Sequence, residues 1–210
     1  MSQAYNVQRL TEQQLPQAIA MIGQAFHNDP LSVYIYPDDA ERTCCLPLMY
    51  SVPLRYTLRY GEITTTPDIT GAACWLPPKS TTMSLKRLLR IGALTTAFKM
   101  GLPGLLRFNK ADTYMQSAHK RCVTEPHWFL LVLGVDPAHQ GQGIGSTLLH
   151  AGLQRADAAG LPCYLDTTNP KNVPLYQKFG FNIASEVTIP NSNLHVWNMV
   201  RPGRDSFRLQ

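Results

Sequence analysis

The chain has 210 residues, of which 44% are hydrophobic, 16% charged and 9% aromatic, a composition typical of a globular protein with one core. It excludes a collagen-like or low-complexity chain, and no apolar stretch reaches the ~20 residues that a membrane-spanning helix needs. The first residues lack a basic segment followed by an apolar run, so we predict no signal peptide and a cytoplasmic location. The five cysteines form no C-x-x-C pair and no pattern with histidines, so we expect neither a metal site nor a disulfide framework. We predict a single domain over residues 1–210.

The net charge of +5 is concentrated in one segment. Residues 79–121 carry nine basic side chains against one acid, Asp112, so this segment alone has a net charge of +8. We predict a helical block here, with two amphipathic helices over 83–99 and 103–121. A solvated helix face is the favoured interpretation, and contact with lipid or nucleic acid stays open as an alternative. The block has few aromatic side chains for base stacking, and we expect neither a nucleic acid nor a membrane as partner.

Within this block, Leu85, Leu88 and Leu89 begin an apolar helix face. Gly92 interrupts the face at its next expected position, although Ile91 and Leu94 lie close enough to extend it. We expect this apolar face to pack inward and most of the basic side chains to point away from it.

The N-terminal part is predicted to alternate strands and helices. Thr11 followed by Gln14 is typical of a capping box that opens a helix, and Asn28-Asp29-Pro30 is interpreted as the end of that helix. The next helix is expected in spite of Pro47 and Pro53. The predicted elements are a strand over 5–10, a helix over 11–26, a helix over 40–59, and strands near 60–66 and 69–76.

The C-terminal part shows the order strand, loop, helix, strand, helix, strand, strand. The run from Trp128 to Val135 is continuously apolar and predicts a strand that is buried on both faces. The order predicts an α/β (α+β) fold whose sheet has an antiparallel end. The elements are a strand over 128–135, a glycine-rich loop over 136–145, a helix over 146–159, a strand over 162–166, a helix over 172–179, and strands over 181–189 and 194–200.

The glycine-rich loop predicts an anion site, because glycines allow close approach of the backbone and a helix N-terminus offers free N–H groups. A P-loop is excluded, since Gly145 is followed by Ser146 and Thr147 with no lysine. A dinucleotide-binding loop is disfavoured, because only 65 residues follow Gly145 and these are too few for the rest of a doubly wound sheet.

Two motifs resemble those of the GNAT superfamily of N-acetyltransferases. Gln140-x-x-Gly143-x-Gly145 resembles the Q/R-x-x-G-x-G/A loop of that family, and Asn169 lies seven residues before Tyr176, which Gly180-Phe181 follows. The stretch from 125 to 201 further resembles the subgroup that contains puromycin N-acetyltransferase. The resemblance implies a GNAT fold with a mixed central sheet of six to seven strands flanked by helices, and an acetyl-CoA-binding core over 125–201. It implies acetyl-CoA as cosubstrate, with no metal.

The resemblance also implies roles for particular residues. In the family, backbone groups of the strand before the loop bind the pantetheine arm, and main-chain amides of the loop bind the pyrophosphate. The first role requires the strand over 128–135 to splay from the strand over 162–166. Carried over to this chain, the coenzyme-binding residues are Leu133, Gly134, Val135, Gln140, Gly141, Gln142, Gly143, Ile144, Gly145, Ser146, Asn169, Asn172 and Tyr176.

For catalysis, the resemblance implies that Tyr176 is the general acid that protonates the departing thiolate. The general base is open among Glu125, His127, Asp166 and water, and Glu125 is favoured because it lies in the segment that resembles the subgroup. The implied activity is acetyl transfer to a primary amine of a small molecule, such as an aminonucleoside or a metabolite. The alternatives are a non-catalytic acyl-CoA sensor, a basic surface-binding module, and a dinucleotide-binding protein. The oligomeric state is left open.

Overall fold

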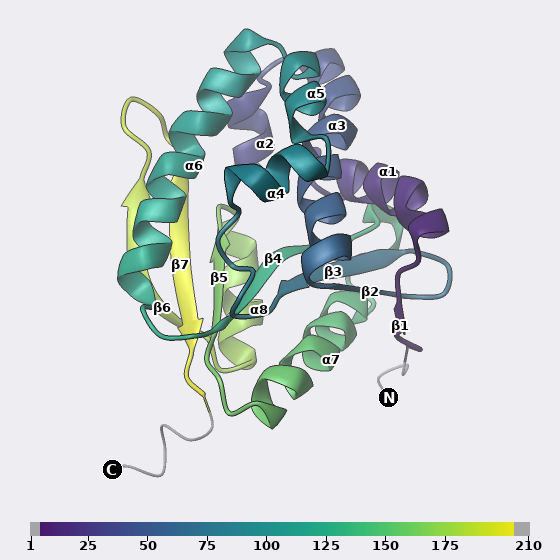
Figure 1. Ribbon diagram of the computed structural model, residues 1–210, viewed down its shortest axis with the longest axis vertical. Helices are drawn as coiled ribbons and strands as arrows, with labels where there is room; N and C mark the ends of the chain where they lie inside the picture. The colour runs from purple at the N-terminus through teal and green to yellow at the C-terminus, as the bar shows by residue number, and fades with distance from the viewer. Residues whose placement is uncertain (1–4, 204–210) are drawn as a thin grey trace.

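The computed structural model describes residues 5–203, in which one seven-stranded sheet is flanked by helices on both faces (Figure 1). The ends of the predicted domain, 1–4 and 204–210, lie outside the described residues. The strand order is β1-β2-β3-β4-β5-β7-β6, and only the β4–β5 pair is parallel. The strands are β1 Gln8–Arg9, β2 Glu62–Thr65, β3 Gly71–Leu76, β4 Trp128–Val135, β5 Cys163–Thr167, β6 Asn182–Thr188 and β7 His195–Arg201. The predicted mixed sheet with an antiparallel end is confirmed.

The helices form two layers. Helices α7 and α8 pack on one face of the sheet, and α1, α3 and α6 cover the other, with α6 lying along β6 and β7 (Figure 1). The helices are α1 Leu15–Ala25, α2 Pro30–Ile35, α3 Asp39–Tyr60, α4 Leu85–Arg90, α5 Ala93–Lys99, α6 Leu102–Cys122, α7 Ile144–Ala158 and α8 Val173–Lys178. Short 3-10 turns precede α1, α7 and α8, at Glu12–Gln14, Pro137–His139 and Pro170–Asn172. In residues 5–203, no helix combines the length and the hydropathy that a membrane span requires.

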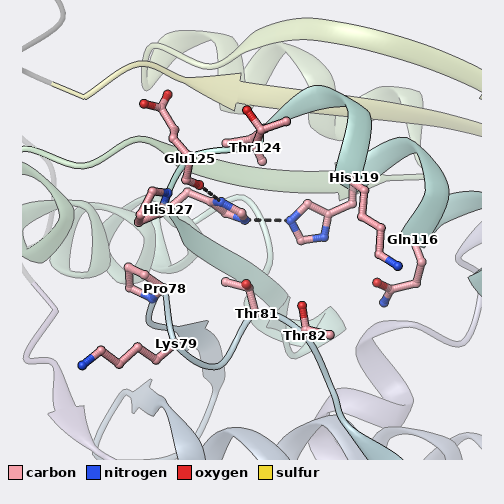
Figure 2. A pocket seen from close by; sticks show the side chains of 12 residues that line it. Pro78, Lys79, Thr81, Thr82, Gln116, His119, Thr124, Glu125 and His127 are labelled. Atoms are coloured by element: carbon pink, nitrogen blue, oxygen red, sulfur yellow. Dashed lines mark hydrogen bonds between the residues drawn. The ribbon is translucent and has the colours of Figure 1, made fainter.

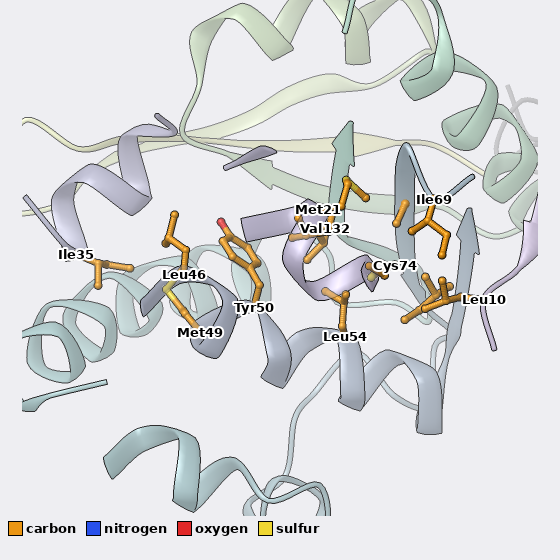
Figure 3. Close-up of a cluster of buried hydrophobic side chains, with 14 of the residues drawn as sticks. Leu10, Met21, Ile35, Leu46, Met49, Tyr50, Leu54, Ile69, Cys74 and Val132 are labelled. Atoms are coloured by element: carbon orange, nitrogen blue, oxygen red, sulfur yellow. The ribbon is translucent and has the colours of Figure 1, made fainter. Parts of the chain in front are cut away.

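The hydrophobic core lies on both faces of the sheet. On the α1/α3 face, Met21, Tyr50 and Leu54 pack with Val132 of β4 (Figure 3). On the α7 face, the indole of Trp75 packs against α7 so closely that a Cβ on Gly152 would lie 2.1 Å from it. The sheet is therefore fixed between two helix layers, which hold the edges of β4 and β5 in place.

The N-terminal predictions are confirmed in large part. The backbone N–H of Thr11 donates to the Gln14 side chain at 3.0 Å, and the capping box opens the 3-10 turn that leads into α1. Helix α3 runs through both Pro47 and Pro53, as predicted. Pairing in the first strand is shorter than expected, because only Gln8 and Arg9 pair with β2.

The Asn28-Asp29-Pro30 sequence begins helix α2, which the sequence analysis did not predict. The Asp29 carboxylate accepts from the Leu31 N–H at 3.0 Å, and Pro30 occupies the first helical position, where its missing N–H costs nothing. The same sequence ends α1 and starts α2. An acidic cap followed by proline is a helix-start signal, and it was interpreted only as a stop.

The helix predicted over 83–99 is wrong as one helix. Gly92 adopts a left-handed conformation (φ 76°) and divides the segment into α4 and α5. The inward apolar face is also only partly correct. Leu88 and Ile91 pack against the core, whereas Leu85, Leu89 and Leu94 are exposed, because helices as short as α4 and α5 can each turn only one narrow side toward the core. The second predicted helix is confirmed as α6.

Candidate active site

Strands β4 and β5 pair at their N-terminal ends and then separate. Their register contains only two pairs, Trp128 with Cys163 and Phe129 with Tyr164. Beyond these pairs, β4 continues to Val135 with only β3 beside it, and the register of β4 with β3 shifts between Cys74 and Trp75. A shift of this kind increases the local twist of a strand, and here it coincides with the separation. We call residues 130–135 of β4 and 165–167 of β5 the β4–β5 opening.

The backbone groups that face the β4–β5 opening follow from the strand register. The Asp136 N–H donates to the Thr70 carbonyl, on the β3 side, at 2.9 Å. Backbone groups alternate in direction along a strand, so those of Gly134 point to β3 and those of Leu133 and Val135 point into the opening. The splay that the sequence analysis required is present, and the two residues singled out for the pantetheine arm face it.

Gly134 lies against helix α1, in the helix layer opposite to α7. A Cβ at this position would lie 2.6 Å from the side chain of Ile22, so the absence of a side chain allows α1 to pack directly on β4. Its place in the structure is explained by helix packing, independently of any coenzyme.

The glycine-rich loop lies at the wide end of the opening and leads into α7. Gly141 and Gly143 have φ values of 77° and 89°, a region that glycine adopts without strain, and open space surrounds both. Helix α7 begins at Ile144, two residues earlier than predicted, and its first intrahelical bond is Thr147 N–H to the Gly143 carbonyl. The N–H groups of Ile144, Gly145 and Ser146 are therefore available at the positive end of the helix dipole.

The loop is braced by its own side chains. Gln140 donates from its side-chain amide to the Val135 carbonyl at 3.0 Å, and Asp136 accepts from the Ala138 N–H at 2.8 Å. Gln142 accepts from the Tyr5 hydroxyl at 3.3 Å. Gln140 thus connects the loop to the end of β4 through one of the backbone groups that face the opening.

The second motif surrounds the start of α8. The Asn169 side chain accepts from the Lys171 N–H at 3.1 Å and caps the 3-10 turn, while Asn172 directly precedes α8. Tyr176 follows on α8 and is buried beside Phe181. Asn169 therefore has a local structural role whether or not it also contacts a coenzyme.

Tyr176 and Asp166 approach the opening from opposite faces of the sheet. Tyr176 belongs to the core on the α7 face, as does Leu165, and alternation along β5 turns the next residue, Asp166, toward α6. Burial, followed by the charges of Asp166 and Asp29, raises the pKa of the Tyr176 phenol well above its usual value. The two side chains are thus electrostatic neighbours across the gap.

Asp166 has an unusually high pKa for a carboxyl group. Burial raises it to about 7, with a further contribution from Asp112 on α6, and a hydrogen bond from Tyr164 opposes the shift. A carboxyl group with a pKa near neutrality is suited to accept and release protons under physiological conditions.

Two further acids lie close to this pair, and the sequence analysis assigned no role to either. Asp29, at the start of α2, accepts from the Thr168 hydroxyl at 2.8 Å and has a pKa raised by burial. Asp112 of α6 also has a pKa raised by burial. They come from elements far from β5 in the sequence, and no local pattern marks them.

A cavity of about 600 Å³ opens on the same face of the sheet, beneath α6 (Figure 2). Its inner wall includes His119 and His127, whose Nε2 atoms are 2.8 Å apart. His127 donates from Nδ1 to the Glu125 carbonyl at 2.7 Å, so in its neutral form its Nε2 accepts from His119. Burial, followed by the neighbouring His127 and Lys120, lowers the pKa of His119 to about 4.

The cavity is connected to Asp166 through stacked and hydrogen-bonded side chains. The His119 ring lies parallel to the Tyr164 ring, with centroids 3.9 Å apart. The Tyr164 hydroxyl donates to Asn198 at 2.7 Å, and burial, followed by the nearby Asp166 carboxyl, raises the pKa of Tyr164. Gln116, another lining residue, hydrogen-bonds Asp112. Side-chain contacts therefore link the cavity lining to the carboxyl groups of Asp166 and Asp112.

Glu125 lies at the opposite end of β4 from the wide part of the opening. It is exposed, and its carboxylate points away from the histidine pair in Figure 2. Trp128, three residues on, donates its N–H to the Pro162 carbonyl, so β4 and β5 are still joined there. The structure brings together Tyr176, Asp166 and Asp29, and it does not bring Glu125 to them. Within residues 5–203, no group of three or more His, Cys, Asp or Glu side chains is arranged to hold a metal ion.

Part of the chain matches the model of a known protein family. Residues 102–181 match the model of the Acetyltransferase (GNAT) family, and this range covers α6, β4, the glycine-rich loop, α7, β5 and α8. All of the elements that form the β4–β5 opening lie within it.

Similar proteins agree with this match. An uncharacterized N-acetyltransferase of Schizosaccharomyces pombe is 24% identical over 194 residues, which are 90% of this chain and 78% of the relative. A mycothiol acetyltransferase of Streptosporangium roseum is 45% identical, but over 60 residues that cover 27% of this chain and 18% of that protein. A solved Corynebacterium glutamicum structure, described as a histone acetyltransferase and related acetyltransferase, has a TM-score of 0.67 at 19% identity. That alignment covers 96% of this chain and 97% of the other.

Proposed function

We propose that this chain, an acyltransferase of the GNAT superfamily of N-acetyltransferases, moves the acetyl group of acetyl-CoA directly to a primary amine of a small molecule. The observation that carries the proposal is the β4–β5 opening with the glycine-rich loop at its wide end. A pantetheine arm is extended and has amide groups, so it can pair with the backbone of Leu133 and Val135 as an added strand would. The free N–H groups at the start of α7 then bind the pyrophosphate.

The chemistry follows from the two side chains across the opening. The amine nitrogen attacks the thioester carbonyl carbon, Asp166 accepts the proton that the nitrogen loses, and the C–S bond breaks as the tetrahedral intermediate collapses. Tyr176 donates its phenolic proton toward the sulfur as negative charge develops there. The raised pKa of Tyr176 keeps its phenol protonated. A backbone N–H of β4 near Val135 stabilises the oxyanion.

We propose Asp166 as the general base in place of Glu125. Asp166 faces the opening from the acceptor side, and its pKa of about 7 lets it accept a proton near neutral pH. The shorter aspartate side chain can act directly or through a water molecule. Glu125 and His127 remain the alternatives from the sequence.

We propose that the acceptor occupies the cavity beneath α6. Its volume of about 600 Å³ lies within the range of small-molecule sites, and its lining combines hydroxyl, amide and imidazole groups with the charged side chains of Glu125, Lys79 and Lys120. The resemblance to the puromycin N-acetyltransferase subgroup keeps aminonucleosides among the candidate acceptors, together with amine metabolites.

The test is acetyl-CoA-dependent thiol release by the purified chain with a panel of amines that includes aminonucleosides, polyamines and amino sugars. We expect turnover with at least one acceptor and its loss in Tyr176→Phe. Tight coenzyme binding with no turnover on any amine or amino-terminal peptide would instead favour a non-catalytic acyl-CoA sensor. Absence of acetyl-CoA binding at millimolar concentration would contradict both the acetyltransferase and the acyl-CoA sensor.

A further inference from the structure

Helices α4, α5 and the start of α6 expose large apolar side chains in pairs. Each helix has two of them four residues apart, and this spacing places both on one helix face. Their exposed fractions lie between 52% and 79%, whereas Val33, Tyr114 and Ile183, the other exposed large apolar residues of the described chain, reach at most 40%. The six side chains, which we call the apolar rim, are Leu85, Leu89, Leu94, Phe98, Leu102 and Leu106.

The apolar rim is not a loosely attached segment. Leu88 and Ile91 pack against the core cluster around Tyr56, and α5 packs on α3. Arg87 hydrogen-bonds the Tyr56 hydroxyl at 3.2 Å and lies 4.7 Å above the Tyr60 ring. The inner sides of these helices are therefore packed against the rest of the protein. The exposed leucines and phenylalanine point outward from helices that are held in place.

Basic side chains alternate with those of the apolar rim along the sequence of these helices. Residues 84–111 contain six lysines and arginines and no acid. Three of the six are engaged, since Arg87, Arg107 and Lys110 donate to groups of the protein. The other three, Lys86, Arg90 and Lys99, are exposed, and within residues 5–203 they form no hydrogen bond or ion pair.

We propose that α4, α5 and the first turns of α6 form a docking surface for a lipid bilayer with anionic headgroups. The apolar rim enters the boundary between headgroups and acyl chains, while Lys86, Arg90 and Lys99 contact lipid phosphates and carboxylates. A surface that combines apolar side chains with unpaired cations matches both layers of such an interface.

Other occupants match the surface less well. A second copy of the chain would bring two basic, acid-free surfaces together, and their like charges would repel. Nucleic acid would use the cations, but leucine side chains gain nothing from a phosphodiester backbone, and Phe98 is the sole aromatic member of the rim. This proposal differs from the expectation from sequence that no membrane partner exists, because the exposure of the rim is a property of the fold.

The test is co-sedimentation of the full chain with vesicles of phosphatidylcholine alone or with about 30% phosphatidylserine. We expect binding to the anionic vesicles that weakens at least tenfold when salt rises from about 0.1 M to 0.5 M. Lys86→Gln, Arg90→Gln and Lys99→Gln together should weaken binding about 100-fold, at about fivefold for each charge. Leu89→Ser with Phe98→Ser should weaken it about 30-fold.

The control is Val33→Ser with Ile183→Ser, which removes two exposed apolar side chains outside the block and should leave vesicle binding unchanged. Circular dichroism and thermal unfolding verify that each variant is folded. The proposal is overturned if the native chain does not sediment with anionic vesicles, or if the Leu89/Phe98 variant binds them as tightly as the native chain. A dimer in light scattering that this variant dissociates, without vesicle binding, would assign the surface to self-association instead.

Discussion

Two regions of the molecule leave groups without partners, and these groups differ in kind. The regions are the β4–β5 opening and the basic block, which is the positively charged segment that contains α4, α5 and α6. At the opening these are the backbone groups of Leu133, the Val135 N–H and the first N–H groups of α7, which together suit an extended ligand with an anionic end. In the basic block they are the apolar side chains and cations of the docking surface. The free backbone groups at the opening depend on glycine spacing and strand order. The exposed side chains of the basic block depend on which faces of its helices are covered by the rest of the fold.

This contrast also separates what each region contributes to function. The opening positions Tyr176 and Asp166 on opposite faces of one sheet, so substitutions there should affect catalysis and coenzyme affinity. Substitutions in the apolar rim should change only association with a bilayer. A rim variant that lowers catalysis, or an opening variant that weakens vesicle binding, would contradict this division.

The largest expected effect is that of Tyr176→Phe. We expect kcat to fall about 10²–10⁴-fold, because the phenolic proton for the thiolate is lost, while the Kd of acetyl-CoA changes little. Steady-state kinetics together with calorimetry of coenzyme binding provide the measurement. Unchanged turnover would remove Tyr176 from the mechanism.

Asp166→Asn, compared with Glu125→Gln, distinguishes the two candidate bases. We expect Asp166→Asn to lower kcat about 10²–10³-fold, and Glu125→Gln, whose side chain lines the proposed acceptor cavity, to change the KM of the amine with kcat nearly unchanged. In the native chain the rate should rise with pH through about 7, because Asp166 must be ionised to accept a proton. A larger loss in the Glu125 variant would restore the base favoured from sequence.

Gly143→Ala tests the glycine-rich loop, and Gly92→Ala is its matched control. Both glycines adopt the left-handed helical region, with φ/ψ of 89°/−1° and 76°/24°, and a Cβ would lie no closer than 3.7 Å to a neighbour at either, so alanine brings a similar backbone penalty to each. Only the first lies at the proposed pyrophosphate site. We expect its Kd for acetyl-CoA to rise about tenfold and that of the control to stay unchanged. An equal rise in both variants would mean that the loop has no direct role.

The smallest effects concern stability at acidic pH. The pKa of folded His119 is about 4, below the unfolded value, so its contribution is complete above about pH 6.5 and decreases as pH falls to about 4. Asp166 acts in the opposite sense, because its pKa of about 7 in the folded chain means that protonation between pH 7 and 4 favours folding.

Urea unfolding at pH 7.5 and 4.5 can separate the two groups. His119→Phe, which retains a ring against Tyr164, should reduce the loss of stability at low pH by on the order of 2 kcal/mol. Asp166→Asn should increase that loss. The same pH dependence in the native chain and both variants would argue against the environments described for these groups.

Much of the fold was predictable from residue order. The capping box at Thr11, the helix that contains Pro47 and Pro53, and the alternation after Trp128 all depend on neighbours close in sequence. The errors have equally local causes. Pro30 was interpreted as a stop although Asp29 caps a new helix, and Gly92 was accepted inside a helix that it divides.

The site was predictable only in part. The glycine spacing and the tyrosine motif indicate the proposed coenzyme side, because a few consecutive residues form it. On the proposed acceptor side, the sequence offered Asp166 as one candidate base but not Asp29 or Asp112, because the three acids come together from β5, α2 and α6 only in the folded chain. The exposure of the apolar rim was missed for a similar reason, because the spacing of leucines does not reveal which of them the core will cover.

The most direct test of the central claim is amide hydrogen exchange of β4 by NMR, with and without saturating acetyl-CoA. In the free protein, the N–H groups of Leu133 and Val135 should exchange faster than that of Gly134, which is paired with β3. Acetyl-CoA should protect Leu133 and Val135 and leave Gly134 unchanged. Unaltered exchange at both residues under saturation would contradict binding of the coenzyme in the β4–β5 opening.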